Sequence, residues 1–440
     1  MPRVRLDSLP LLGDLPAFRR DRLGFLARLA RDQGDVARFS IGPYRVWQLS
    51  HPQLIHEVLV THAERFRKGP VLQRARAVLG DGLLTAEGEH HRRHRRLLNH
   101  AFHPDRVRDY APVMVELAAA TADRWSEGVA IDVHAQTVRM TLATAGATLL
   151  GTEVEEQVDL VERAVDDLLS AYQLAFVPFG WRLQHLPVGP PRRLRRGRGA
   201  LYGLVDRMVA ERRASGVDGG DLLSSLVLDD ADDRLLDQEI CEEALTLLLA
   251  GHETTANALA FSLYLLAQDP ELEARVHAEL DAVLGGRRPT ADDRDWLPVC
   301  RGVFAEALRL YSPSWAMARE AIDEHPVDGH TVRPGEVVVA PQWVVHRDAR
   351  WWPDPERCDP DRWLPDAPAA RPRSAYFPFG GGVRQCIGEG FAWTEGVLAL
   401  ATIAGRWRLR AVVDRPLELD PLITLRPRGG LWLRPERRTP

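Results

Sequence analysis

The stretch best suited to chemistry is a glycine-rich segment, 379–388, which reads Phe-Gly-Gly-Gly-Val-Arg-Gln-Cys-Ile-Gly and places Cys386 just before a predicted helix. Consecutive glycines adopt backbone conformations that other residues avoid and let a flat ligand approach closely. Amide groups and the dipole at a helix start favour an anionic sulfur. A thiolate is a good ligand for iron, and an axial thiolate favours O–O cleavage. The alternative is a buried structural thiol in a turn.

A second stretch interrupts a long apolar helix predicted over 237–267. Residues 250–255 read Ala-Gly-His-Glu-Thr-Thr, and glycine and threonine are poor residues for a helix interior. An acid beside a hydroxyl between apolar turns is costly unless it has a purpose. We therefore expect Glu253 and Thr254 to relay protons to an oxygen ligand. The alternative is a turn in which Glu253 is simply solvated.

Two charged pairs lie further along the chain. Glu306 and Arg309 are three residues apart on a predicted helix, and such neighbours usually contribute only a few tenths of a kcal/mol. The same spacing occurs at 64/67 and 89/92, so surface pairing is the alternative. His90 and His94, one helical turn apart, could also bind a metal, but the sequence indicates no third ligand.

In this order the motifs resemble the cytochrome P-450 family. The cysteine segment matches F-x-x-G-x-R-x-C-x-G, 250–255 matches A-G-x-E/D-T-T, and Glu306/Arg309 precede Arg362 as in the family's Glu-Arg-Arg scaffold. Here 360–363 reads P-D-R-W, whereas the family often shows P-E-R-F. The resemblance runs from about residue 10 to 434. It implies a mainly α fold, a single haem domain over 1–440 with a helix-rich lobe and a small β-rich lobe.

The resemblance also implies residue roles. Cys386 becomes the axial ligand of haem b, with Glu253 as the acid and Thr254 as the alcohol. Cationic partners for the haem propionates, and residues that contact the haem, are expected among the following: His91, Arg95, Arg319, Arg384, Phe379, Gly380, Gly388, Ala250 and Gly251.

The activity implied is that of a haem-thiolate monooxygenase, which inserts one oxygen atom of O2 into a hydrophobic molecule. The sequence has no G-x-G-x-x-G fingerprint with an acidic ribose contact and no P-loop, so electrons are expected from NAD(P)H through a separate ferredoxin reductase and ferredoxin. Arg92, Arg93 and Arg96 are predicted to form part of a basic docking face. The alternatives are a haem sensor or electron carrier, a peroxide-dependent peroxygenase, and a helical interaction protein without a cofactor.

The substrate is expected to be a terpenoid, a fatty acid or another secondary metabolite, because the candidate pocket residues carry no charge. These candidates are two predicted loops, 70–86 and 172–188, together with Leu248, Leu249, Ala250, Trp315, Ala316, Met317, Leu422 and Ile423. Ordinary core packing is the alternative for each of them.

Composition narrows the class of protein. A net charge of −5 does not favour nucleic-acid binding, and the four cysteines form no C-x-x-C pair, which argues against a zinc ribbon. No apolar run of about 20 residues is present, so we predict a cytoplasmic protein without a membrane anchor. We also expect a monomer. Of 57 Lys and Arg residues only Lys68 is a lysine, which is typical of a GC-rich genome.

The elements that must position these residues are mostly helices. Residues 1–20 are predicted to be irregular, 176–191 a loop and 327–345 a small sheet, with a final hairpin that joins 423–425 to 431–433. Short strands are predicted at 36–40 and 44–49. Helices are predicted at 89–102, 112–127, 155–173, 193–214, 237–267, 271–284, 299–311 and 387–406.

Overall fold

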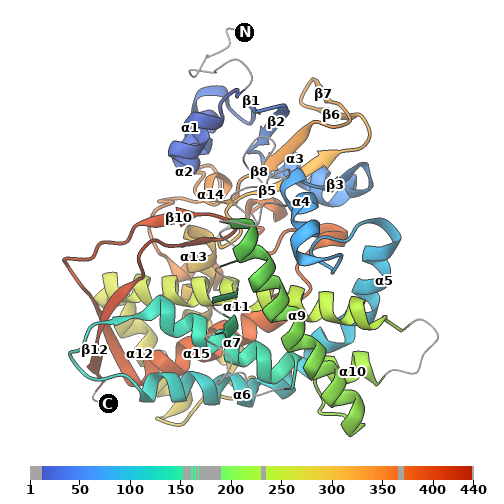
Figure 1. Ribbon diagram of the computed structural model, residues 1–440. Helices are drawn as coiled ribbons and strands as arrows, with labels where there is room; N and C mark the ends of the chain where they lie inside the picture. Colours follow the sequence, from blue (N-terminus) through green and yellow to red (C-terminus); the bar gives the residue numbers. More distant parts are fainter. Residues whose placement is uncertain are drawn as a thin grey trace.

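The computed structural model describes residues 12–151, 160–161, 163–164, 167, 190–228, 234–364 and 371–438. Figure 1 shows a helical body crossed by α11 and, above it, a smaller lobe that holds most strands. Most of the predicted helix 155–173, all of the predicted loop 172–188, and the predicted loop 176–191 except for its last two residues lie outside the described residues. The mainly α fold with a small β-rich lobe is confirmed.

Helices supply most of the described structure. They are α1 (Leu15–Arg20), α2 (Arg22–Gln33), α3 (Pro52–His56), α4 (Pro70–Leu79), α5 (Gly88–Leu98), α6 (Pro104–Asp123), α7 (Val133–Leu149), α9 (Pro190–Ser215), α10 (Leu222–Val227), α11 (Asp237–Gln268), α12 (Pro270–Leu284), α13 (Pro298–Leu310), α14 (Gln342–Val345) and α15 (Glu389–Arg406).

Helix α11 is the centre of the body because it is apolar on nearly every side. It packs against α7, α13 and α15, and most of its residues are buried. A helix that is hydrophobic all round must be enclosed by other elements. Its end is fixed by Asp269, whose side chain accepts hydrogen bonds from the first amides of α12. The two motif-bearing helices α11 and α13 are therefore held at the core of the molecule.

The principal sheet of the smaller lobe has five strands in the order β1-β2-β8-β5-β3. Its strands are β1 (Val36–Ile41), β2 (Tyr44–Leu49), β3 (Phe66–Lys68), β5 (Met317–Ala321) and β8 (Val337–Ala340). The remaining strands pair in small groups: β4 (Ile131–Asp132) with β12 (Trp432–Arg437) and β9 (Trp407–Ala411), β6 (His325–Val327) with β7 (His330–Val332), and β10 (Leu419–Pro421) with β11 (Leu425–Pro427).

The structure corrects several predicted boundaries in the first half of the chain. Residues 15–20, predicted to be irregular, form α1, and most of the expected loop 70–86 forms α4. Helix α6 begins at Pro104 rather than 112, with Pro112 inside the helix. Proline usually marks a helix start because it lacks an amide donor. Here residues on both sides of Pro112 are buried on one helix face, so tertiary packing outweighs that local cost.

Two predictions near the C-terminal end were wrong. Residues 342–345, assigned to the sheet, form the short helix α14. The predicted hairpin does not form, because β11 pairs with β10 while β12 pairs with β9 and β4. A Cβ on Gly430 would lie 2.3 Å from the Asp132 carboxylate, and Leu431 N donates to that carboxylate at 2.9 Å. The glycines therefore let the chain reach β4 instead of turning back on itself.

Among the described residues, no helix is both long enough and apolar enough to cross a bilayer.

Candidate functional site

The cysteine segment is a folded loop between the sheet lobe and α15. Cys386 N donates to the Phe379 carbonyl oxygen at 2.9 Å, and Gln385 N donates to Gly382 O at 3.0 Å. The Phe379 ring lies 6.1 Å from the Trp393 ring, between centroids. These bonds fix the sulfur at the end of a closed turn that leads into α15.

Two glycines in this loop have positive φ angles, +75° at Gly380 and +67° at Gly382. A Cβ on Gly380 would lie 2.9 Å from the terminal methyl of Met317, and one on Gly382 would lie 2.3 Å from Leu59 O. L-residues rarely adopt this conformation. Both positions therefore favour glycine on conformational grounds, and Gly382 also requires it on steric grounds because its neighbours are backbone atoms.

The Cys386 thiol is accessible, yet protein surrounds it on most sides. Burial raises its pKa to about 11, opposed by the hydrogen bond from the Gly388 backbone and the charge of Arg95. Helix α15 begins at Glu389, three residues after Cys386, and the backbone amide of Gly388 acts to lower the pKa of the thiol against this burial, as expected for amides at this position. A bound metal ion itself deprotonates a coordinating thiol.

The four predicted propionate contacts lie together, and a fifth basic residue that the sequence analysis missed, Lys68, lies among them. This cation cluster consists of Lys68, His91, Arg95, Arg319 and Arg384. Burial lowers the pKa of His91 to about 4, and the charges of Lys68, Arg384 and Arg95 add to the effect. Burial likewise lowers the pKa of Lys68 to about 7 and that of Arg319 to about 10. All five side chains therefore share one poorly solvated region.

The hydrogen bonds within the cation cluster go mostly to backbone carbonyls. Lys68 Nζ donates to Leu83 O and Ala86 O at 2.7 Å, and Arg95 donates to Gln385 O at 2.6 Å. Arg384 donates to the carboxylate of Glu87 at 2.9 Å.

Lys68 and Arg319 are direct partners across the β3–β5 pair, and both are buried. Like charges opposite one another destabilise a sheet. Among the described residues, the side-chain hydrogen bonds of the four basic residues other than His91 reach a single carboxylate, that of Glu87, which accepts from Arg384. The region therefore favours the binding of further anions. The two carboxylates of a haem match this excess of positive charge, and the residues present therefore fit haem. Lys68 was missed because it lies outside the recognised motifs, although its status as the single lysine was a signal.

The scaffold pair Glu306/Arg309 is fully buried and bidentate. Arg309 Nε and Nη2 donate to the two Glu306 oxygens at 2.7 Å each. Arg309 also donates to three backbone carbonyls, at His346, Pro355 and Arg357. The surface alternative for this pair is wrong, whereas the pair Glu89/Arg92 with the same spacing is exposed. The buried pair joins α13 to the segment that precedes the cysteine loop.

Residues 359–363 complete the surroundings of Glu306. Asp359 N donates to Glu306 Oε2 at 2.9 Å, and Trp363 Nε1 donates to Oε1 at 3.0 Å. Arg362 Nε lies 3.8 Å from the same carboxylate, and its Nη2 donates to Asp354 O. The tryptophan that departs from the family pattern thus supplies an indole donor that phenylalanine lacks.

The predicted distal residues lie in the middle of α11. Ala250 is exposed, and Gly251, Glu253 and Thr254 are half-buried, although the turns on either side are buried. Thr254 Oγ1 donates to Ala250 O at 2.7 Å along the helix. An accessible acid and hydroxyl in an otherwise enclosed helix favour the functional interpretation over a solvated surface turn.

The Glu253 carboxylate is held by a residue that the sequence analysis missed. Thr424 Oγ1 donates to Glu253 Oε1 at 2.9 Å, and the chain continues through Asn257 to His134. Burial lowers the pKa of His134. No motif contains Thr424, so only the fold connects it to the distal acid.

The pocket candidates are divided between core and accessible positions. Leu248 is buried in the core, whereas Leu249 and Leu422 are half-buried and Ile423 is exposed. Trp315 is mostly buried, and its indole donates to Leu422 O at 3.1 Å. Ala316 and Met317 are half-buried, and Met317 contacts the cysteine loop at Gly380. Core packing therefore accounts for Leu248.

The predicted docking arginines differ in environment. Arg92 and Arg96 are exposed, with Arg92 paired to Glu89. Arg93 is turned toward α11, where it donates to Glu239 at 3.0 Å and to Arg234 O at 2.7 Å. Arg93 is therefore engaged within the protein.

Comparisons with known proteins agree with this geometry. The family model described as Cytochrome P450 matches residues 2–433. Cyclooctatin synthase from Streptomyces melanosporofaciens is 38% identical, over 99% of this chain and 95% of that protein. Cyclooctat-9-en-7-ol 5-monooxygenase from the same organism is 39% identical, over 92% of this chain and 89% of its own length. Pentalenene oxygenase from Streptomyces avermitilis is 36% identical, over 98% of this chain and 97% of that protein.

A solved structure gives the same result. The cytochrome P450DA heme domain superposes with a TM-score of 0.89 at 29% identity, covering 98% of this chain and 97% of that one. The cysteine loop, the buried Glu-Arg pair and the acid–alcohol pair all lie within the matched region. The chain therefore belongs to the cytochrome P450 family, oxidoreductases that bind haem and use O2.

Proposed function

We propose that this protein inserts one oxygen atom of O2 into a terpenoid, with haem b bound through Cys386 and electrons delivered by a separate ferredoxin and its NAD(P)H-dependent reductase. The observation that carries the proposal is the acid–alcohol pair of α11, which is accessible in an otherwise buried helix. An electron carrier or sensor has no need of proton donors at that position. The single haem domain, the monomeric state and the cytoplasmic location remain predictions.

Haem, when bound, supplies the iron that activates O2. Cys386 provides the sulfur ligand, and Phe379, Gly380 and Gly388 shape the loop that presents it. The cation cluster receives the propionates, because its buried charges otherwise lack sufficient anions. Replacing the single lysine by Lys68→Met tests this assignment.

We expect the Lys68→Met protein to fold but to lose haem faster to an apoprotein acceptor, since one propionate partner is removed. Arg67→Met is the control, because Arg67 is adjacent in sequence but pairs with Glu320 at 2.6 Å. Equal rates of haem loss in both variants would remove Lys68 from the cofactor site.

Glu253 and Thr254 carry protons in the proposed reaction. The Glu253 carboxyl is bound to the Thr424 hydroxyl, and the Thr254 hydroxyl is bound to Ala250 O, so neither acts on the other as placed here. A side-chain rotation of Glu253 away from Thr424, or an intervening water, brings the carboxyl into reach of Thr254 Oγ1. Thr424 is therefore proposed as a positioning residue that holds the acid at the edge of the site.

The proposed substrate class rests on the relatives and on the local chemistry. Their names specify pentalenene and cyclooctat-9-en-7-ol, which are terpenoids with at most one alcohol. The accessible candidates Leu249, Ala250, Leu422 and Ile423 offer apolar surface. A polycyclic hydrocarbon skeleton with few oxygen atoms is the best match to such a lining.

Electron delivery is proposed to use the exposed end of α5, where Arg92 and Arg96 lie. Reversing both charges is expected to weaken ferredoxin binding and to reduce its salt dependence. Binding that keeps its salt dependence in the double variant would exclude this face.

The decisive experiment is a substrate screen with purified, haem-loaded protein. Polycyclic terpenoids and fatty acids are titrated separately while the low-spin to high-spin shift of the Soret band is recorded. A terpenoid that shifts the spectrum, and that gains one oxygen atom only when O2 and the electron-transfer proteins are present, supports the proposal. Turnover of fatty acids alone would overturn the substrate class, and full turnover with peroxide alone would favour a peroxygenase.

A further inference from the structure

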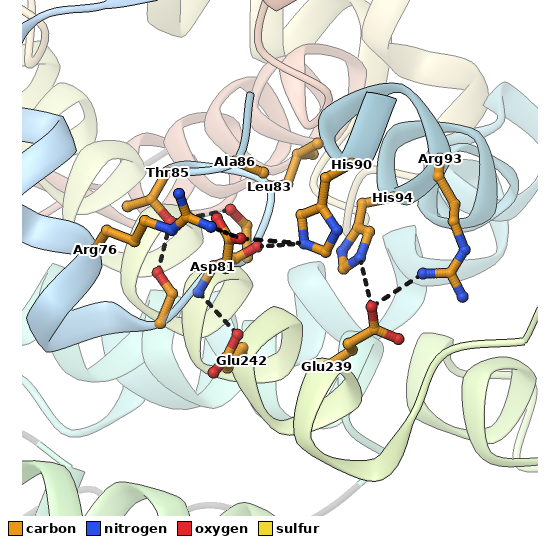
Figure 2. A network of polar contacts seen from close by, with 12 residues as sticks. Arg76, Asp81, Leu83, Thr85, Ala86, His90, Arg93, His94, Glu239 and Glu242 are labelled. Carbon is orange, nitrogen blue, oxygen red and sulfur yellow. Dashed lines mark hydrogen bonds and ion pairs between the residues drawn. The ribbon is translucent and has the colours of Figure 1, made fainter. Parts of the chain in front are cut away.

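A second polar cluster lies between α5 and the first turns of α11. One ring nitrogen of His90, one of His94 and a carboxylate oxygen of Glu239 lie within 4.8 Å of one another. Figure 2 shows the two imidazoles side by side, with Glu239 below them. The two rings come from consecutive turns of α5, and Glu239 comes from the start of α11. The fold thus provides the third potential ligand that the spacing of His90 and His94 did not indicate.

The positions of His94 and Glu239 already match part of a metal site. His94 Nε2 lies 3.3 Å from Glu239 Oε1. Ligands bound to zinc at 2.0–2.1 Å in a tetrahedron are about 3.3 Å apart. The other nitrogen, His94 Nδ1, lies 2.5 Å from Glu243 Oε1, and Glu243 is completely buried. A carboxylate on the distal nitrogen of a metal-binding histidine is the usual arrangement around protein-bound zinc, where it orients the ring.

Asp81 lies beside His90, next to this group of three residues. Its Oδ2 lies 3.6 Å from His90 Nε2, and its Oδ1 is buried without a hydrogen-bond partner. The Asp81 backbone carbonyl accepts from His90 Nε2 at 3.0 Å, so this nitrogen carries the proton as placed here. Metal binding through Nε2 requires the proton to move to Nδ1, and the Asp81 carboxylate then lies 3.6 Å from the nitrogen that would bind the ion.

The cluster also has an excess of negative charge. Its four carboxylates are Asp81, Glu239, Glu242 and Glu243. Asp81 pairs with Arg76, and Glu239 pairs with Arg93. Glu242 accepts from Asp81 N at 2.8 Å, and Gln238 also donates to it. Two guanidinium groups thus face four carboxylates within the cluster, and the two remaining negative charges can be balanced by protons on His90 and His94, with Lys68 close enough to interact with Glu243. A divalent cation would balance the same two charges.

We propose that His90, His94 and Glu239 bind a divalent transition-metal ion, preferably Zn²⁺, with the Asp81 carboxylate beside His90 as the candidate for the fourth position. Two imidazoles and two carboxylates suit zinc, whereas calcium and magnesium prefer ligand sets made of oxygen alone. The ion would tie α5, which carries His91 and Arg95, to the helix that carries Glu253 and Thr254. Its role is structural: it fixes the helix of the propionate contacts against the oxygen-activating helix.

The competing arrangement is a metal-free ion pair. Burial by itself lowers the pKa of His94, but the hydrogen bonds and charges of Glu243 and Glu239 outweigh it and raise the pKa. A zinc ion must displace that proton. The titration is therefore performed above the ordinary pKa of histidine.

The experiment is a calorimetric titration of chelator-treated, haem-loaded enzyme with Zn²⁺ alone. The variants are His90→Ala and Glu239→Gln, in which glutamine can still accept the hydrogen bond from Leu236 N. His103→Ala is the matched control, because it removes an exposed histidine 3.3 Å from Asp105. The Soret band verifies that each variant is folded and loaded with haem.

We expect the native protein to bind one Zn²⁺, the two variants to bind it at least about tenfold more weakly, and the control to behave like the native protein. A zinc-edge anomalous peak between His90, His94 and Glu239 in crystals would support the same result. Absence of binding to the native protein, or equal affinity in all four proteins, would overturn the proposal and leave the ion pair as the explanation. Zinc should also raise the melting temperature of the native protein and the control, but not that of His90→Ala.

Discussion

The cysteine side and the distal side of the proposed haem site are built in opposite ways. On the cysteine side, Glu306 accepts from Arg309, Asp359 and Trp363, and the loop amides bond within the loop. On the distal side, Thr254 bonds only along its own helix within the described part of the chain, and Glu253 accepts from Thr424 and lies 3.9 Å from Arg426 Nη1. The first region is bound into the fold by many elements, whereas the second depends on few contacts.

This difference suggests a division of labour. A ligand loop with obligatory partners holds the sulfur in one place, and any change there should affect folding or cofactor binding. A proton donor must change partners during a reaction, so loose attachment suits it. Changes on the distal side should therefore affect the reaction more than the fold.

The largest effect should follow from Cys386→Ala or Cys386→His. Either change removes the sulfur, so the long-wavelength Soret band of the reduced CO complex should disappear. Cys241→Ala is the control, since Cys241 is a buried thiol that donates to Asp206 at 2.9 Å. A band retained without Cys386 would disprove the ligand assignment.

Arg309→Ala should have the next largest effect, which is on folding and haem loading. It leaves the Glu306 carboxylate buried without its bidentate partner, at a cost of about 3–5 kcal/mol. Little soluble, haem-loaded protein is expected, as measured by the yield of the CO difference spectrum. Arg92→Ala removes the exposed partner of Glu89 at the same spacing and should cost about 0–1 kcal/mol. Similar yields from both variants would erase the contrast between buried and surface pairs.

On the distal side, Thr254→Ala should leave folding and haem binding intact but divert electrons from product to peroxide. Loss of one proton-transfer group typically lowers the rate about 10²–10⁴-fold, and the ratio of product to NAD(P)H consumed measures the coupling. Ser262→Ala on the same helix is the control, because Ser262 also donates to the carbonyl four residues earlier, at 2.7 Å. Full coupling in Thr254→Ala would remove its relay role.

The last prediction concerns stability alone and involves Glu395, an acid on α15 that contrasts with the fully paired Glu306. Both of its carboxyl oxygens are buried without a hydrogen-bond partner, and burial raises its pKa to about 8. The unfolded chain loses this proton near the ordinary value of 4.5 while the folded chain keeps it until about 8. Unfolding therefore releases a proton between these values, and the free energy of unfolding falls as pH rises through this window.

Glu395→Gln should remove this dependence, which amounts to about 1.4 kcal/mol per pH unit. Denaturant unfolding of both proteins at several pH values measures the difference. The two proteins should be similar at the acid end of the window, and the variant should be more stable at neutral pH. Parallel pH profiles would show that Glu395 ionises normally.

The sequence by itself determined the chemistry of the site. The spacing around Cys386, the acid and alcohol at 253–254 and the Glu-Arg pair were readable because each requires specific residue types at short separations along one loop or helix. The long helices were predicted to within a few residues where their apolar faces were continuous, as for α9, α11 and α13. Short-range geometry is encoded locally, so a linear pattern is sufficient to find it.

Only the tertiary structure decided which distant residues meet. Lys68 joins the propionate contacts because β3 pairs with β5, Thr424 reaches Glu253 because the C-terminal strands cross α11, and Glu239 meets His90 and His94 because α11 begins beside α5. The pairing of β12 with β9 and β4 likewise replaced the expected hairpin. These contacts depend on packing between elements far apart in the chain, where many arrangements satisfy the same local pattern and burial in the folded core selects one.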